Sequence, residues 1–272
     1  MATKTAVVTG STKGIGKGYA RELLKRGVNV VVSGRGQEAL DKASKDLEDE
    51  GVEGARAIGQ TCDVADVTQV QALWDYAVNA FGSVDYWINN AGFARSGPTL
   101  LQLTPDEITA MVHSNVIGTI NGSQVAVKGM TAQGYGRLYN TYGAGSDGRA
   151  IPGMIGYGTT KSAVRYFTDS LIKELKGKPV KVGSISPGMN VTENMLIQIQ
   201  KRPPKIREKM IKPLNLLGDH VETTTPWIVD RILADQQSGT AIKWLTTGKI
   251  LGRLLSAPFK KRDVFSRYSL DD

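Results

Sequence analysis

The sequence has one cysteine, no long apolar run and no zinc-ligand spacing. Cys62 is the only cysteine and cannot close an internal disulfide, so covalent cross-links do not hold this fold together. No apolar segment reaches the length of about 20 residues that a membrane-spanning helix requires. No nucleic-acid-binding motif is present either. We therefore expect a soluble protein that holds no metal ion and binds no nucleic acid.

The length of 272 residues and the 31 glycines suit one large α/β domain with many tight turns. Residues 1–10 already have the pattern of a strand and its turn, so we expect no leader segment and a cytoplasmic location. The net charge is +8, and in residues 239–272 seven basic residues outnumber three acidic ones. Ile250, Leu251, Leu254 and Leu255 have helical spacing there, which predicts a basic amphipathic tail over residues 246–272.

A glycine-rich turn between two apolar strands is the first functional signal. The β-branched run of residues 4–9 leads into Gly10-Ser-Thr-Lys-Gly-Ile-Gly16, and a helical pattern and a second strand, residues 28–33, follow. Glycines let the backbone come close to a phosphate, and the start of a helix supplies free N–H donors. This strand–turn–helix–strand context predicts a dinucleotide-binding site.

The residues after the second strand indicate which dinucleotide. A site for NAD normally has a carboxylate there, whereas this chain has Ser33-Gly34-Arg35. Arg35 and Lys13 could bind a 2′-phosphate through charge-assisted hydrogen bonds, which favours NADPH over NADH. The alternative for each of the two is a solvated surface charge.

The strand–helix alternation continues to residue 245 without a repeat or linker. Right-handed crossovers then build a single doubly wound parallel sheet with helices on both faces, within one domain of residues 1–245. We predict one helix over residues 104–130, with a capping box at Thr104 and Glu107, and another from about Thr225, with Pro226 at its start. Residues 191–218 combine a short apolar helix with basic, proline-containing sequence. We predict that they form a mobile lid.

Tyr157 and Lys161 lie four residues apart in a predicted helix. Their Cβ atoms would be about 5–6 Å apart on one face, so the ammonium group would favour the ionised form of a phenol whose ordinary pKa is about 10. Acid–base catalysis needs such tuning. Taken alone, however, the pair is more often an accidental feature of a surface helix.

Several motifs occur together in one order: the glycine turn, Asn89-Asn-Ala-Gly92, Asn115, Tyr157-x-x-x-Lys161 and Pro187-Gly188. In this order the chain resembles the short-chain dehydrogenase/reductase family over about residues 4–245. The resemblance implies a Rossmann-type fold, a homo-oligomer, Tyr157 as the acid, Lys161 on the nicotinamide ribose and Asn115 anchoring a water of the proton relay. The cofactor site that it implies comprises Gly10, Ser11, Thr12, Lys13, Gly14, Ile15, Gly16, Arg35, Asp63, Val64, Asn89, Ala91, Gly92, Tyr157, Lys161, Pro187, Gly188 and Thr192.

One position departs from the family pattern. The family usually has a serine thirteen residues before the tyrosine, and this chain has Ala144 there, so we take Ser146 as the candidate for the missing hydroxyl. The segment of residues 140–152 resembles that of chlorophyll b reductases. This implies NADPH-dependent reduction of the C7 formyl group of chlorophyll(ide) b to hydroxymethyl, as in chlorophyll catabolism.

Three points accompany this interpretation. A plastid location applies if the chain is a mature form, and the tail could contact a membrane peripherally. A general ketone or aldehyde reductase is the first alternative function. A non-catalytic NADP-binding protein is the second, and the absent serine favours it.

Overall fold

The computed structural model describes residues 3–268, and its centre is a seven-stranded parallel sheet. The strand order is β3-β2-β1-β4-β5-β6-β9. The strands are β1 (Thr5–Val8), β2 (Asn29–Gly34), β3 (Ala57–Thr61), β4 (Tyr86–Asn89), β5 (Gly136–Thr141), β6 (Val180–Ser186) and β9 (Ala241–Lys243). The order changes direction between β1 and β4, and ligands bind at such a point beyond the carboxyl ends of the strands. The predicted doubly wound sheet is confirmed.

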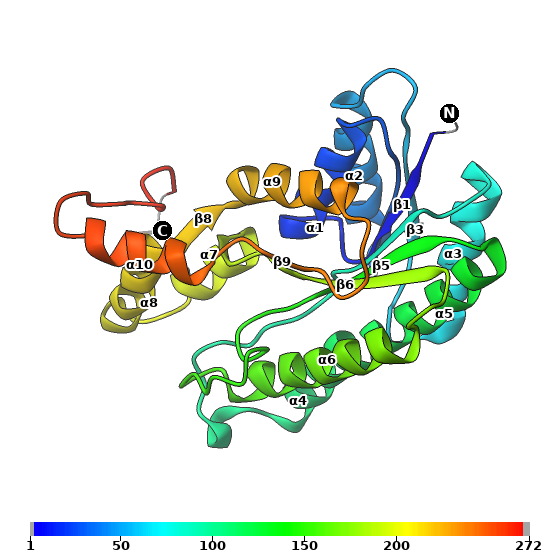
Figure 1. The fold of residues 1–272 in the computed structure, drawn as a ribbon. Helices are drawn as coiled ribbons and strands as arrows, with labels where there is room; N and C mark the ends of the chain where they lie inside the picture. Colours follow the sequence, from blue (N-terminus) through cyan, green and yellow to red (C-terminus); the bar gives the residue numbers. More distant parts are fainter. Residues whose placement is uncertain (1–2, 269–272) are drawn as a thin grey trace.

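Helices cover both faces of the sheet (Figure 1). One face packs against α1 (Gly14–Leu24), α2 (Gln37–Asp49) and α9 (Val221–Ala234), and the other against α3 (Val67–Phe81), α5 (Gly118–Gln133) and α6 (Ile155–Glu174). Successive side chains of a strand point to opposite faces, so Val8 lies in the first core cluster and Val7 in the second. Continuous apolar strands are therefore buried on both sides, as a parallel sheet requires.

The predicted single helix over residues 104–130 is interrupted. The chain passes through η1 (Leu100–Gln102), α4 (Pro105–Val112), a π-helical turn η2 (His113–Ile117) and then α5. The predicted capping box at Thr104 and Glu107 is present. The wider turn at η2 holds Asn115, which is fully buried and hydrogen-bonded to the backbone of Phe93. Such turns are frequent at functional sites.

The predicted start of the helix near Thr225 is wrong, because α9 begins at Val221 and contains Pro226 in its interior. The first turn of α9 packs directly on α1. A side chain at Gly18 of α1 would overlap Val221 and come within 2.8 Å of Thr225. This close helix contact stabilises the extra turn despite the proline.

The predicted lid region, residues 191–218, forms two helices and a small sheet. It comprises α7 (Glu193–Gln200) and α8 (Pro204–Leu217), and β7 (Met189–Val191) pairs in parallel with β8 (Gly218–His220). The chain ends in α10 (Thr247–Ser256), which lies beside α8 (Figure 1). Val264 and Phe265 are buried against Leu214 and Ile199 of the lid region. Residues 246–268 of the predicted tail therefore pack on the lid region, and residues 269–272 lie outside the described part.

Within residues 3–268, no helix combines the length and the apolar character needed to cross a membrane.

Candidate functional site

The turn after β1 forms a cradle of backbone donors. Gly10 and Gly14 have φ angles of 61° and 57°, which only glycine adopts without strain. No side chain caps the start of α1, so the N–H groups of its first turn remain free to bind an anion. Asn90, which the sequence reasoning did not select, holds the turn by donating from Nδ2 to the carbonyls of Thr9 (3.0 Å) and Gly10 (3.1 Å). These residues fit the pyrophosphate of a nicotinamide dinucleotide.

The two predicted phosphate-binding cations have different surroundings. Lys13 donates from Nζ to Oδ1 of Asn194 in α7, at 3.0 Å. Arg35 is exposed immediately after β2. The expectation that both bases serve a 2′-phosphate therefore depends mainly on Arg35, since Lys13 has a partner in the lid region.

Lys161 and Asn115 meet beside Gly92. Nζ of Lys161 is buried and donates to the Thr141 carbonyl at 2.9 Å. Oδ1 of Asn115 accepts from the Phe93 amide at 2.7 Å. A Cβ atom at Gly92 would lie 3.2 Å from Oδ1 of Asn115 and 3.7 Å from Nζ of Lys161, so the missing side chain leaves these two polar atoms facing one space. The structure thus brings together three of the residues predicted for the site.

Thr160, a further residue that the sequence reasoning missed, couples this group to the tyrosine. Its Oγ1 accepts from Nδ2 of Asn115 at 2.9 Å and donates to the Tyr157 carbonyl at 2.7 Å. Nζ of Lys161 lies 5.8 Å from the centroid of the Tyr157 ring. Asn115, Thr160, Tyr157 and Lys161 therefore form one connected unit. The sequence signal that could have identified Thr160 is its position inside the Tyr-x-x-x-Lys motif.

Burial shifts the pKa values of both Tyr157 and Lys161. It raises the pKa of the Tyr157 phenol to about 12. It lowers the pKa of the Lys161 amine to about 8. The expected lowering of the tyrosine pKa by the lysine is wrong, because burial removes water from the phenol and disfavours its ionised form. Tyr157 is consequently a protonated phenol at neutral pH and can donate a proton.

The glycine-rich segment before α6 lies against this phenol. A Cβ atom at Gly143 would fall 2.9 Å from Cζ of Tyr157 and closer still to Oη. Ser146 is buried, and its Oγ accepts from the Gly143 amide at 3.0 Å. Helix α6 holds the same segment, since Ser162 donates to the Gly145 carbonyl (2.8 Å) and Arg165 to the Ser146 carbonyl (3.1 Å). The predicted hydroxyl of Ser146 thus supports the turn that faces the tyrosine.

Asn89 joins three elements in the interior. Its Nδ2 donates to Oδ1 of Asn140 at 2.9 Å and to Oγ of Ser123 at 3.0 Å, and its Oδ1 accepts from Nε1 of Trp87 at 2.8 Å. The side chain is thereby engaged within the protein. It positions the end of β4, from which Ala91 and Gly92 continue into the site.

The remaining predicted cofactor residues lie around the cradle or beneath it. Ser11 is buried and donates to the Val8 carbonyl at 2.6 Å, so its side chain serves the turn itself. Thr192 caps α7 and would be 3.6 Å from a Cβ atom at Gly14, which places the start of the lid region against the glycine turn. Four of the others make packing contacts: Thr12 with Gly34, Ile15 with the hydrophobic core, Val64 with Gly118, and Gly188 with Trp244. The remaining two accept hydrogen bonds, Asp63 from the Ala65 amide and the Pro187 carbonyl from Asn190.

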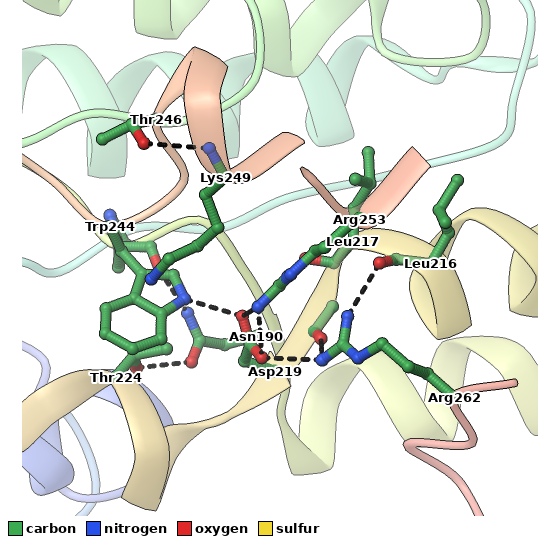
Figure 2. A network of polar contacts seen from close by, with 12 residues as sticks. Asn190, Leu216, Leu217, Asp219, Thr224, Trp244, Thr246, Lys249, Arg253 and Arg262 are labelled. Atoms are coloured by element: carbon green, nitrogen blue, oxygen red, sulfur yellow. Dashed lines mark hydrogen bonds and ion pairs between the residues drawn. The ribbon is translucent and has the colours of Figure 1, made fainter. Parts of the chain in front are cut away.

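A buried carboxylate joins the lid region to the tail, and no sequence signal predicted it. Asp219 of β8 accepts from Nε1 of Trp244 at 2.6 Å and from Nη2 of both Arg253 and Arg262 at 2.8 Å (Figure 2). Nζ of Lys249 lies 3.2 Å above the Trp244 ring. These contacts hold α10 and the following turn in place.

Two other kinds of site receive no support. Within residues 3–268, no group of three His, Cys, Asp or Glu side chains is arranged to hold a metal ion. Cys62 is buried, and burial raises the pKa of its thiol to about 12, so it is no activated nucleophile.

Comparison with known proteins supports the geometry. Residues 4–202 match the family model described as short chain dehydrogenase. The chain is 34% identical to the Probable chlorophyll(ide) b reductase NYC1, chloroplastic, of Arabidopsis thaliana over 91% of this chain and 52% of that protein. It is also 34% identical to the Chlorophyll(ide) b reductase NOL, chloroplastic, of the same plant over 92% of this chain and 72% of that protein.

A solved structure has a similar fold. A variant of actinorhodin polyketide ketoreductase, crystallised with NADPH, superposes with a TM-score of 0.79 at 27% identity, over 92% of this chain and 99% of that chain. The chain spans about half the length of the NYC1 relative that it matches, at 52%. The fold, the glycine cradle and the matched family model agree, and the chain belongs to the short-chain dehydrogenase family.

Proposed function

We propose that this protein is an NADPH-dependent reductase of a carbonyl group on a bulky hydrophobic substrate, with the C7 formyl group of chlorophyll(ide) b as the substrate and 7-hydroxymethyl chlorophyll(ide) a as the product. The observation that carries the proposal is a protonated Tyr157 phenol facing the small residues of the Gly143 turn. A phenol in that position donates a proton to a carbonyl oxygen.

The residues of the chain have separate tasks in this reaction. When bound, NADPH supplies a hydride to the carbonyl carbon. Tyr157 gives its phenolic proton to the oxygen, which takes up the electron pair of the C=O π bond. Thr160 links Asn115 to the tyrosine, and Lys161 lies beside the tyrosine ring. We propose that Lys161 and Asn115 return a proton to the phenolate by way of an ordered water. Ser146 keeps the Gly143 turn against the phenol.

The proposed cofactor preference is supported by the end of β2. No carboxylate stands there, and Arg35 is exposed at the place where a 2′-phosphate would lie. An arginine can form paired, charge-assisted hydrogen bonds to a phosphate that NADH lacks. The related ketoreductase structure contains NADPH.

The proposed substrate class is supported by the lack of bulk around the tyrosine. Gly143, Ala144 and Gly145 carry at most one side-chain carbon each, so a wide planar ring could lie close to the phenol. The apolar contact available to a macrocycle, at about 25 cal/mol per Å², favours it over a small aldehyde. The NYC1 and NOL relatives bear the name chlorophyll(ide) b reductase, which refers to such a macrocycle.

The proposal also covers the lid, the oligomeric state and the cellular compartment. We propose that residues 191–218 act as the lid and that the protein works as a homo-oligomer. Its compartment would be the cytoplasm, or the plastid, to which the names of the relatives refer.

The deciding experiment supplies NADPH with chlorophyllide b, chlorophyll b and a panel of small ketones and aldehydes. We expect kcat/KM for the pigments to exceed that for the small carbonyls, with the product identified by chromatography. Tyr157→Phe should lower kcat by about 10²-fold or more and leave NADPH binding intact. Inert pigments with efficient turnover of a small carbonyl would establish the general reductase instead. Bound NADPH with no turnover of any carbonyl would establish the non-catalytic alternative.

A further inference from the structure

Helix α10 is oriented opposite to an ordinary surface helix, because its basic residues point inward. Lys249 lies over the Trp244 ring at 3.2 Å. Arg253 binds Asp219 at 2.8 Å and the Leu217 carbonyl at 2.8 Å (Figure 2). These two side chains are four residues apart and so share the face of α10 that packs on the protein.

The apolar residues of α10 face away from the protein. Each residue of a helix turns by about 100°, which places Leu251, Leu254 and Leu255 around the side opposite to Lys249 and Arg253. These leucines are 56%, 49% and 68% exposed, and Phe259, just beyond the helix, is 92% exposed. We call these four residues the leucine ridge. A surface helix normally buries such a stripe, and a contiguous exposed one marks an interaction site.

Positive charge surrounds the leucine ridge. Lys260 and Lys261 follow Phe259 directly, and both are exposed. The neighbouring helix α8 has three lysines and one arginine against a single acid, Glu208, which is paired with Lys212 at 2.8 Å. Lys205 of that helix is exposed as well. A stripe of large apolar side chains bordered by lysines is complementary to a bilayer with anionic headgroups.

We propose that the leucine ridge docks the protein on an anionic lipid surface. The leucines and Phe259 enter the boundary between headgroups and acyl chains, and Lys260 and Lys261 contact the anionic headgroups. The Asp219 contacts fix α10 with its apolar face outward, so the docking surface is preformed in the folded protein. Docking would bring the lid region, which packs on the same tail, next to the membrane. This proposal does not depend on the proposed reaction.

The test measures co-flotation of the full chain with vesicles of phosphatidylcholine alone or with about one third phosphatidylglycerol. We expect binding to the anionic vesicles only, weakened by about 0.5 M salt. Leu254→Asn/Leu255→Asn should lower the partition coefficient by at least about ten-fold. Val52→Asn is the matched apolar control, because Val52 is 39% exposed in the loop before β3, at the opposite end of the sheet.

The charge component has its own variant and control. Lys260→Gln/Lys261→Gln should also reduce binding several-fold, while Lys176→Gln/Lys178→Gln changes the net charge equally in the loop before β6 and should have no effect. Circular dichroism melting verifies that each variant is folded.

Four results would overturn the proposal. The first three are no binding to either kind of vesicle, equal binding to neutral and anionic vesicles, and unchanged vesicle binding of both tail variants. The fourth is a protein that does not bind vesicles but forms an oligomer whose mass falls in Leu254→Asn/Leu255→Asn. The last result would show that a second copy of the chain covers the ridge.

Discussion

Replacement of Gly143 by alanine tests the tyrosine site most directly. The added Cβ atom would lie 2.9 Å from Cζ and 3.1 Å from Cε1 of Tyr157, and nearer to the hydroxyl oxygen. Carbon atoms in contact prefer a separation of about 3.5–4.0 Å, so the ring must retreat by at least about 0.6 Å. The φ angle of Gly143 is not positive, so alanine meets no backbone strain. The perturbation is therefore a displacement of the phenol.

The expected result is a catalytic defect without a folding defect. A misplacement of about 1 Å can cost about 10²-fold in rate, so we expect kcat to fall by about ten-fold to 10²-fold, with the Kd for NADPH unchanged. The assay is steady-state oxidation of NADPH with the best carbonyl substrate, together with titration of the cofactor by fluorescence. A melting curve close to that of the original protein would show that the fold is retained.

Gly158→Ala provides the matched control in the neighbouring helix α6. Its Cβ atom would meet only the Ala144 carbonyl oxygen and Cα of Gly145, both at 3.8 Å, which are ordinary contacts. Alanine within a helix is more stable than glycine by about 0.5–1 kcal/mol, so this variant should be active and slightly stabilised. Wild-type kcat in Gly143→Ala, or an equal loss in Gly158→Ala, would refute the steric reasoning.

Three further predictions concern the cofactor, the buried lysine and the tail. Arg35→Ala should weaken NADPH binding by about ten-fold or more and leave NADH binding unchanged, and equal losses for both would contradict the role of Arg35. Burial lowers the pKa of Lys161 from 10.5 to about 8, so burying its charge costs up to about 3 kcal/mol below pH 8, and this cost disappears above about pH 10.5. Lys161→Met should therefore raise the free energy of unfolding near pH 7 but not near pH 11, as urea denaturation at the two pH values would show, and equal effects at both would contradict this. Asp219→Asn should lower the free energy of unfolding by about 3–5 kcal/mol, because two largely buried guanidinium groups lose their carboxylate. Glu222→Gln, which removes an exposed pair, should cost less than about 1 kcal/mol in the same assay.

The sequence determined the parts of this protein that depend on neighbours along the chain. Apolar runs such as residues 28–33 became buried strands, because a parallel sheet covered on both faces needs unbroken apolar segments. The turn from Gly10 to Gly16 was predictable because its glycines and the following helix start are local features. The spacing of Tyr157 and Lys161 likewise placed both on one face of α6.

Only the tertiary structure decided the features that depend on residues distant in the sequence. Burial by other segments set the direction of the Tyr157 pKa, against the local expectation from Lys161. The π-helical turn at Asn115 arises where that side chain binds Phe93 and Thr160, 22 and 45 residues away. The helical period of α10 was visible in the sequence, but its outward-facing leucines were not, because Asp219, 34 residues before Arg253, draws the charged face inward. Hydrophobic periodicity shows that a helix has two faces, and long-range contacts decide which of them is buried.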